Sequence, residues 1–366
     1  MELHSFGCRV LEEKRIQAAF ALLEAERGKG NFPGFSALVG QGDQTLASSS
    51  GGFTHPVSRA DNQPVTGSTI FDCASLTKVV VTLPLLLILV DHGRLSLSDP
   101  VSRYLPAFAG EGKEQVTLQH LLTHTSGLPS SLDLYSHGWS REQIVGHVCR
   151  ASLTAKPGER VVYSDLGFIL LGEIASALLR QPLEQAARRL VLEPLGMADS
   201  GFCPGDLLKP RIAATEFDPA LGRHKHGEVH DENAAAMGGV SGHAGLFATA
   251  ADLAAYAAMW LGRGTYRGRR LFSRAAAEAA LRRWTAQEGA ARGLGWVLRG
   301  DTQDGAGDWF SVRAFGHTGF TGTSLWLDPD GERFAILLTN RVYGGRGYSI
   351  TRLRACFHNA VAAAFR

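Results

Sequence analysis

The chain has 366 residues, of which 45% are hydrophobic and 20% are charged, so it is long enough for a large core and more than one lobe. Its 37 Lys and Arg residues against 35 Asp and Glu leave a formal net charge of +2. This balance gives no electrostatic case for nucleic acid or an anionic membrane surface as a partner. The five cysteines include no C-x-x-C pair. They therefore argue against a disulfide framework and suit a reducing compartment.

The start of the chain lacks the pattern of an export signal. Charged residues at positions 12–15 stand where a signal peptide needs an apolar stretch. The strongest apolar run, residues 79–90, is too short to span a bilayer. We therefore expect a cytoplasmic protein that has no membrane-spanning segment.

The first predicted elements are a helix and two strands. Residues 9–27 show helical periodicity and end at a Gly-Lys-Gly break. Residues 35–40 and 45–50 are typical of strands, joined by a turn at 41–43. A long buried helix is then expected from Ser75 to about Asp91, in which Pro84 should kink the helix or loosen one turn.

Helical patterns dominate the middle of the chain, and strand patterns return near its end. Helices are predicted at residues 166–179, 183–192 and 251–261, strands at 324–327 and 333–339, and a last helix at 347–364. We therefore predict an α+β fold in which both ends of the chain build one sheet, flanked by the terminal helices. Residues 1–366 would form a single unit of two lobes, a sheet lobe from 1–74 and 301–366 and a mainly helical lobe from 75–300.

The tetrapeptide Ser75-Leu-Thr-Lys78 is the first candidate for chemistry. Positions i and i+3 share one helix face, so the Lys78 amine should lie beside the Ser75 hydroxyl. A serine hydroxyl becomes a useful nucleophile when an adjacent base takes its proton. A helix N-terminus also offers free N–H groups to a developing oxyanion.

Two further triplets could complete such a site. Tyr163-Ser-Asp165 precedes a predicted helix, and a tyrosine between two cations could shuttle a proton to a leaving group. His317-Thr318-Gly319 precedes the last two strands, and its glycine would let an edge strand approach a ligand closely. The N–H of the next residue, Phe320, could serve as the second oxyanion donor beside that of Ser75.

Together, these three motifs resemble those of the serine β-lactamase-like and penicillin-binding-protein family, which includes class C β-lactamases, DD-peptidases and β-lactamase-like carboxylesterases. Three further segments support the resemblance, at residues 116–129, 157–167 and 192–197. It extends over about residues 30–345. The resemblance implies a β-lactamase/transpeptidase-like fold with a central antiparallel sheet.

By this resemblance Ser75 is the nucleophile and Lys78 and Tyr163 share the base role, with neither preferred. His317 stands where the family usually has lysine, and a neutral imidazole is a weaker anchor for a substrate carboxylate than a permanent cation. Asp165 stands where β-lactamases usually have asparagine, and a carboxylate is expected to pair with Lys78. Both changes weaken the case for efficient penicillin hydrolysis.

A histidine-rich segment at residues 224–247 suggests a metal site at first sight. His230 and His243 are not at helical ligand spacing, and a glycine-rich loop joins them. We therefore expect no metal and no cofactor, and we expect His230, Asp231 and Asn233 to line the substrate cleft or to hold its wall together. The same segment is similar to a cytoplasmic branch of the family associated with recycling of cell-wall fragments.

The sequence thus predicts a serine hydrolase that cleaves an amide or ester of a small molecule or peptide through an acyl-enzyme on Ser75. The resemblance adds cell-wall peptide fragments as a candidate substrate class. A short-chain carboxylesterase would use the same catalytic residues, so it stays an alternative. A non-catalytic scaffold with the same fold is a second alternative, against which the retention of all three motifs argues. The oligomeric state stays open.

Overall fold

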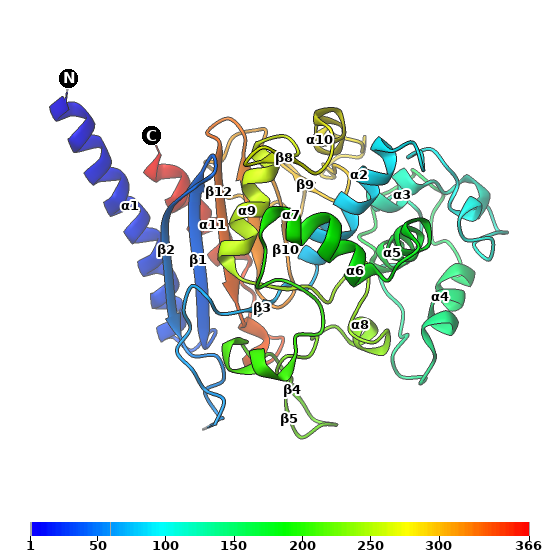
Figure 1. Cartoon of the computed structure of the whole chain (residues 1–366), viewed down its shortest axis with the longest axis horizontal. Coiled ribbons are helices and arrows are strands. Elements are labelled where there is room, and N and C mark those ends of the chain that lie inside the picture. Colours follow the sequence, from blue (N-terminus) through cyan, green and yellow to red (C-terminus); the bar gives the residue numbers. More distant parts are fainter. Residues whose placement is uncertain (1, 59, 366) are drawn as a thin grey trace.

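The computed structural model describes residues 2–58 and 60–365, with side chains from residue 14 onward. Its central feature is a six-stranded sheet (Figure 1). The strands follow the spatial order β2 (Gln44–Gly52), β1 (Gly34–Gln41), β12 (Arg333–Thr339), β11 (Ser324–Asp328), β10 (Phe315–Thr318) and β9 (Val297–Leu298). Every neighbouring pair is antiparallel. The prediction that both ends of the chain build one antiparallel sheet is confirmed.

Helices cover both faces of this sheet. Ala37 and Val39 of β1 pack into the core formed with α1 (Glu2–Gly28) and α11 (Thr351–Ala364). Leu38 between them belongs to the other core, together with residues of α9 (Ala250–Leu261). Because successive strand side chains point to opposite faces, three consecutive buried residues require a cover on each side. Figure 1 shows α1 and α11 on one face and α9 on the other.

The remaining helices lie mostly beyond α9. They are α2 (Leu83–Asp91), α3 (Leu118–Leu122), α4 (Arg141–Arg150), α5 (Asp165–Leu179), α6 (Leu183–Ala187), α7 (Glu193–Leu195), α8 (Glu232–Ala236) and α10 (Arg274–Leu281). The connections among the described residues contain short helical turns. Two of them are π-helical, η1 (Lys78–Thr82) and η4 (Arg188–Leu192). The others are 3₁₀ turns, η2 (Val101–Arg103), η3 (Lys113–Gln115), η5 (Asp206–Arg211) and η6 (Arg341–Gly344). Three small strand pairs complete the fold, β3 (Phe71–Asp72) with β6 (Phe247–Ala248), β4 (Phe217–Asp218) with β5 (Arg223–His224), and β7 (Thr265–Tyr266) with β8 (Arg269–Arg270).

The helix that carries the proposed nucleophile motif is the buried centre of the molecule. Every residue from Leu83 to Leu89 is buried, as expected for a helix that is apolar all round. The predicted loosening near Pro84 is confirmed, because the turn immediately before it, η1, is π-helical. Proline removes a backbone donor and clashes with the preceding turn, and a wider turn relieves both problems.

Three expectations about the elements need correction. The last helix begins at Thr351, not at 347, because residues 345–350 after η6 stay irregular and Gly345 has a φ of +98°. The range 75–300 is too wide for a helical lobe, since β9 belongs to the sheet and α9 packs on it. The strand that carries His317, β10, is not the edge strand that was expected, because the two-residue strand β9 pairs with Phe315 and Gly316.

No single helix among residues 2–58 and 60–365 is both long and apolar enough to cross a membrane. The helices Asp165–Leu179 and Leu183–Leu195 reach that length and composition only as a pair, which is bent by 73°.

Helix α5 and the loop that carries His243 touch backbone to backbone. A Cβ atom on Gly242 would lie 2.1 Å from the carbonyl oxygen of Phe168 and 2.9 Å from the Cα atom of Gly172. We therefore expect Gly242→Ala to lower the free energy of unfolding by about 1–3 kcal/mol, measured by urea denaturation. In α4, Gly146→Ala meets only the flexible end of Arg150, at 3.4 Å, and should be neutral or stabilise by up to about 1 kcal/mol. Equal effects at the two sites would contradict this account.

Candidate active site

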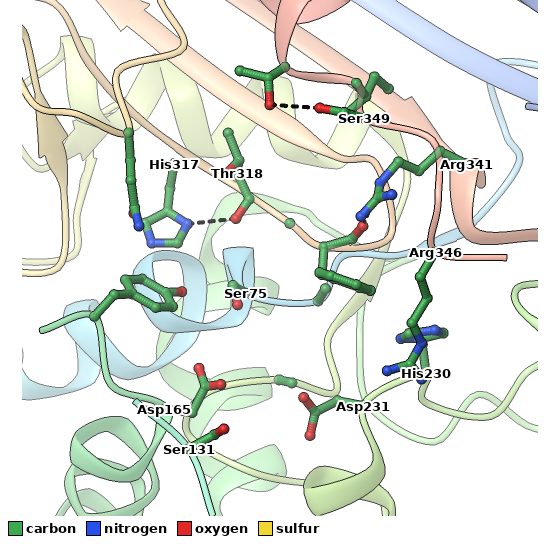
Figure 2. A pocket seen from close by; sticks show the side chains of 18 of the residues that line it. Ser75, Ser131, Asp165, His230, Asp231, His317, Thr318, Arg341, Arg346 and Ser349 are labelled. Atoms are coloured by element: carbon green, nitrogen blue, oxygen red, sulfur yellow. Dashed lines mark hydrogen bonds between the residues drawn. The ribbon is translucent and has the colours of Figure 1, made fainter. Parts of the chain in front are cut away.

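A strained turn presents Ser75 to solvent at the start of the central helix. Ala74 has a φ of +46°, a conformation that residues with a Cβ atom rarely adopt. Asp72 accepts the Ala74 N–H at 2.8 Å, and Thr77 donates its hydroxyl to the Ala74 carbonyl at 2.7 Å. These bonds hold the turn, so the partly exposed Ser75 side chain faces the cleft shown in Figure 2.

Lys78 is fully buried and reaches three oxygen atoms. Its Nζ donates to Ser75 Oγ at 2.8 Å and to the His243 carbonyl at 3.2 Å, and it forms an ion pair with Asp165 at 2.7 Å. Burial alone would lower the pKa of Lys78, but Asp165, together with Tyr163, outweighs burial and raises this pKa above its ordinary value. The predicted pairing of Asp165 with Lys78 is confirmed, and the amine beside Ser75 is a cation.

Tyr163 is half-buried and lies against four side chains from separate segments. The Lys78 amine is 4.9 Å from the centre of its ring, and the His124 ring centre is 4.5 Å away. The centres of the Tyr163 and His317 rings are 6.0 Å apart, and the Arg292 guanidinium carbon also lies 6.0 Å from the tyrosine ring centre. The three motif residues Ser75, Lys78 and Tyr163 therefore meet in one place.

His317 is buried in β10 and carries no charge at neutral pH. Its Nδ1 lies 2.9 Å from the Thr318 carbonyl oxygen, which can only accept, so Nδ1 holds the proton and Nε2 presents a lone pair. Burial, followed by the cations Lys78 and Arg292, lowers the pKa of His317 to about 3. A neutral ring with this tautomer cannot donate to a carboxylate from Nε2. The structure therefore does not support an anchoring role for His317.

The residues after β10 are fastened to the segment before Ser75. A Cβ atom on Gly319 would lie 2.5 Å from the Cys73 carbonyl oxygen, so the glycine allows close approach to this backbone. Its expected close approach to a ligand stays a prediction. Thr323 donates to the same carbonyl at 3.1 Å. Within the described part of the chain, the N–H groups of Ser75 and Phe320 make no hydrogen bond. Their predicted use as a pair of oxyanion donors stays a prediction.

Arg292 and His124 belong to the site, although sequence reasoning did not single them out. Arg292 is buried just before β9, where Asp301 pairs with its guanidinium at 2.9 Å. His124 accepts the Ser164 N–H at its Nδ1, at 3.0 Å, which positions the loop that carries Tyr163. His124 lies within the family-like segment 116–129, so that segment could have indicated it. No motif marks Arg292.

Ser75, Tyr163 and His317 line a cleft of about 920 Å³, whose lower wall in Figure 2 is acidic. Among the predicted residues, Thr318, Gly319 and Phe320 line it, as do His230, Asp231 and Asn233. His230 and Asn233 also hold the wall together. The His230 Nε2 lies 2.9 Å from Glu216, and Asn233 bonds to the backbone of Leu132 and Leu134 at 2.9 and 3.1 Å.

The other end of the cleft is positive. Arg341 donates to the carbonyls of Phe320 and Tyr348 at 2.9 and 2.6 Å, and Arg354 donates to those of Gly319 and Thr323 at 2.8 and 2.7 Å. Arg346, which also lines the cleft, is paired with Glu216 and Glu232, whereas neither Arg341 nor Arg354 forms an ion pair within residues 2–58 and 60–365. Helix α11 begins there without a side-chain cap, which adds free N–H groups. This end of the cleft is therefore suited to an anionic group.

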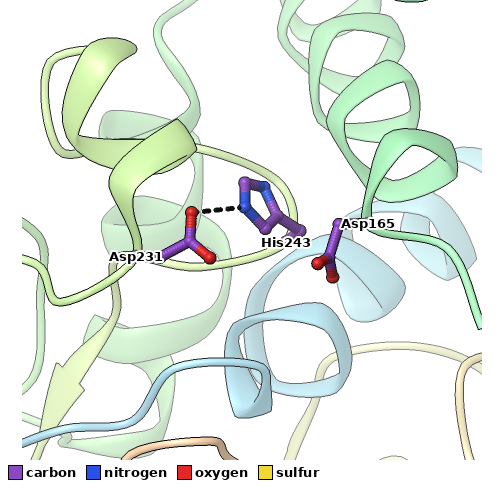
Figure 3. Close-up of side chains that lie close together, drawn as sticks. All are labelled: Asp165, Asp231 and His243. Atoms are coloured by element: carbon purple, nitrogen blue, oxygen red, sulfur yellow. Dashed lines mark hydrogen bonds and ion pairs between the residues drawn. The ribbon is translucent and has the colours of Figure 1, made fainter. Parts of the chain in front are cut away.

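Asp165, Asp231 and His243 lie close enough together to suggest a cation site (Figure 3). One ligand atom from each lies within 4.8 Å of the others. Both His243 nitrogens are engaged, however, with Asp231 at 2.9 Å and with the Ser241 hydroxyl at 2.8 Å. Asp165 already forms an ion pair with Lys78. These donors are therefore committed to each other and to Lys78, and they fit a metal ion poorly.

The fold and the grouping of serine, lysine and tyrosine define a serine hydrolase that acts on amide or ester bonds. The family model described as Beta-lactamase matches residues 19–357, and the chain belongs to this family. An N-acetylmuramyl-L-alanine amidase of Bacillus subtilis (strain 168) is 31% identical over 366 aligned positions, covering 90% of this chain and 81% of the relative. A relative in Escherichia coli (strain K12), named "Putative D-alanyl-D-alanine carboxypeptidase", is 33% identical. The alignment covers 76% of this chain and 71% of the relative.

A solved structure described as a class C beta-lactamase has the same fold. It superposes with a TM-score of 0.78 and covers 97% of each chain, at 20% sequence identity. The predicted β-lactamase/transpeptidase-like fold is confirmed.

The Asp231–His243 pair should show itself in the pH dependence of stability. Burial alone would raise the pKa of Asp231, but His243 outweighs burial and places this pKa below its ordinary value. A depressed carboxyl pKa stabilises the fold above the unfolded-state value of about 4, and this contribution is lost as the pH falls through the folded-state value. The stability advantage of the native protein over Asp231→Asn should therefore shrink between pH 6 and pH 3 in urea unfolding. A difference that stays constant over this range would contradict the assignment.

Proposed function

We propose that the protein cleaves an amide bond in a cell-wall peptide fragment, through an acyl-enzyme on Ser75. The observation that carries the mechanism is the hydrogen bond from a cationic Lys78 amine to Ser75 Oγ. An amine that is already protonated cannot accept the serine proton, so another group must be the base. Tyr163, beside Lys78, is the titratable group suited to that role.

The proposed reaction runs in two halves. Ser75 Oγ bonds to the carbonyl carbon while its proton passes to ionised Tyr163, and the oxyanion is held by the N–H groups of Ser75 and Phe320. The carbon–nitrogen bond then breaks, and Tyr163 returns the proton to the leaving amine. Water hydrolyses the ester by the same route, with Tyr163 taking the water proton and returning a proton to Ser75 Oγ.

The two ends of the cleft support a peptide substrate. Arg341 and Arg354 would bind a carboxylate of the substrate, which replaces the anchoring role expected of His317. Asp165 and Asp231 on the opposite wall would accept hydrogen bonds from hydroxyl, amide or ammonium groups. The names of the two relatives, an amidase and a carboxypeptidase, favour cell-wall peptides among such molecules. A cytoplasmic location is part of the proposal, supported by the free cysteines Cys73, Cys149, Cys203 and Cys356.

Purified protein should hydrolyse muramyl peptides faster than β-lactams or p-nitrophenyl butyrate, and Ser75→Ala should remove turnover of all of them. A fluorophosphonate should add one mass increment to the native chain at Ser75, measured by peptide mass spectrometry. Turnover of the ester alone would favour the carboxylesterase alternative. A folded native protein that is neither labelled nor active on any of these compounds would favour the scaffold alternative and end the proposal.

Tyr163→Phe should lower kcat by roughly two to four orders of magnitude, because the ring stays and only the proton acceptor is lost. The matched control is Tyr135→Phe, which removes a hydroxyl from an exposed residue lining the same cleft and should change kcat by less than about threefold. Steady-state kinetics on one substrate measure both. Near-normal turnover of Tyr163→Phe across the pH range would return the base role to Lys78.

A further inference from the structure

The base of the proposed mechanism is ionised Tyr163, and nearby positive charge would stabilise this anion. The strand β10 does not supply such a charge. His317 stands at the position where the family usually has lysine. Its ring is neutral, and its Nδ1–H donates a hydrogen bond to the Thr318 carbonyl. Lys78 supplies one cation, and Asp165 at 2.7 Å offsets part of its charge, as Asp301 at 2.9 Å does for Arg292. A second cation from another segment would therefore further stabilise the ionised form of Tyr163.

Arg292 is placed to be that cation. Its guanidinium carbon lies 6.0 Å from the Tyr163 ring centre, and its side chain is 3% exposed. Arginine remains protonated in proteins. Its Nη1 is buried and has no hydrogen-bond partner within the described residues, so the group is not fully satisfied by its own surroundings.

The surroundings of Arg292 fix its position. Asp301 pairs with its Nε at 2.9 Å and accepts from its Nη2 at 2.9 Å, and Gln303 accepts from Nη2 at 2.9 Å. The Arg292 N–H donates to the Thr285 hydroxyl at 3.0 Å, and its carbonyl accepts from the Trp284 N–H at 2.8 Å. Because side chain and backbone are both held, the charge stays at a fixed distance from the tyrosine.

Four titratable or charged groups lie against the Tyr163 ring, namely Lys78, His124, Arg292 and His317. Two carboxylates pair with the cations among them, Asp165 with Lys78 and Asp301 with Arg292. His124 accepts the Ser164 N–H, and burial, followed by Arg292 and Lys78, holds its pKa well below the ordinary value, so it is neutral. His317 is neutral as well. Only Lys78 and Arg292 among these four are cations. Burial lowers the pKa of Arg292, and Asp301 first and Tyr163 second oppose this effect.

We propose that Arg292 is a positioning residue that stabilises the ionised form of Tyr163, in the role that a lysine at position 317 would otherwise have. This proposal rests on the proposed function, because it acts through Tyr163 as the base. It assigns the second cation to the segment before β9 and leaves the cleft wall at His317 uncharged. Substrate binding and base activation are then served by different arginines, since Arg341 and Arg354 line the cleft and Arg292 does not.

The test follows the rate of Ser75 phosphonylation by a fluorophosphonate as a function of pH. In this reaction the Oγ–P bond forms, fluoride leaves, and the serine proton passes to Tyr163, so no knowledge of the natural substrate is needed. In Arg292→Gln the rise of the rate with pH should move upward by about one pH unit, with a roughly tenfold slower rate at pH 7. Arg292→Lys keeps the charge and should restore most of this shift.

Arg299→Gln is the matched control. Arg299 follows in the same segment and pairs with Asp304 at 2.6 Å, so its loss tests for general damage to this region. Its pH profile should equal that of the native protein. If Arg292→Gln fails to fold, judged by its thermal unfolding, Arg292→Ala with added guanidinium replaces it, and the added cation should accelerate labelling.

Three outcomes separate the possibilities. A folded Arg292→Gln with an unshifted profile, or a rate loss that is equal at every pH and not restored by lysine, would overturn the role of Arg292. If Tyr163→Phe keeps the native profile, the profile does not report Tyr163 and the base assignment fails with it. If the native protein is not labelled at Ser75 at all, the proposed function itself fails.

Discussion

The buried ion pair between Lys78 and Asp165 is the constraint on which the rest of the site depends. An ammonium group inside a protein costs several kcal/mol unless it is paired and hydrogen-bonded, and Lys78 meets both conditions through Asp165, Ser75 Oγ and the His243 carbonyl. Asp165 is the first residue of α5, where the helix dipole favours a carboxylate. Three distant segments must therefore meet before the charge can be buried, and their meeting also forms the site.

Protonation of Lys78 determines which neighbouring group can accept the serine proton. In the proposed mechanism the amine, which donates to the hydroxyl, orients Ser75 and adds positive charge, while Tyr163 would transfer the proton. Burial first, and the cations Lys78 and Arg292 next, keep His317 neutral. In the proposed mechanism these two cations would therefore both support Tyr163 as the base and disfavour a charged anchor at position 317.

Local patterns made much of this predictable. The i, i+3 spacing in S-x-x-K placed Lys78 beside Ser75, and the charge at position 165 predicted its pairing with Lys78. Other features depend on the folded chain. The tautomer and the low pKa of His317 follow from burial and from a carbonyl in the next residue, which no motif encodes. Arg292 lies far from all three motifs in sequence, and only the packing of the segment before β9 against Tyr163 brings it near.

The cleft has opposite charges at its two ends, and this bears on how a substrate lies in it. Arg341, Arg354 and the uncapped start of α11 form the positive end, and Asp165 and Asp231 form the negative one. Figure 2 shows Ser75 between Arg341 and these two carboxylates. A molecule with a carboxylate on one side of its scissile bond and donor groups on the other gains from one orientation and loses from its reverse. An uncharged short-chain ester would gain from neither end. The charge pattern therefore favours peptide amides over simple esters, although both would use the same nucleophile.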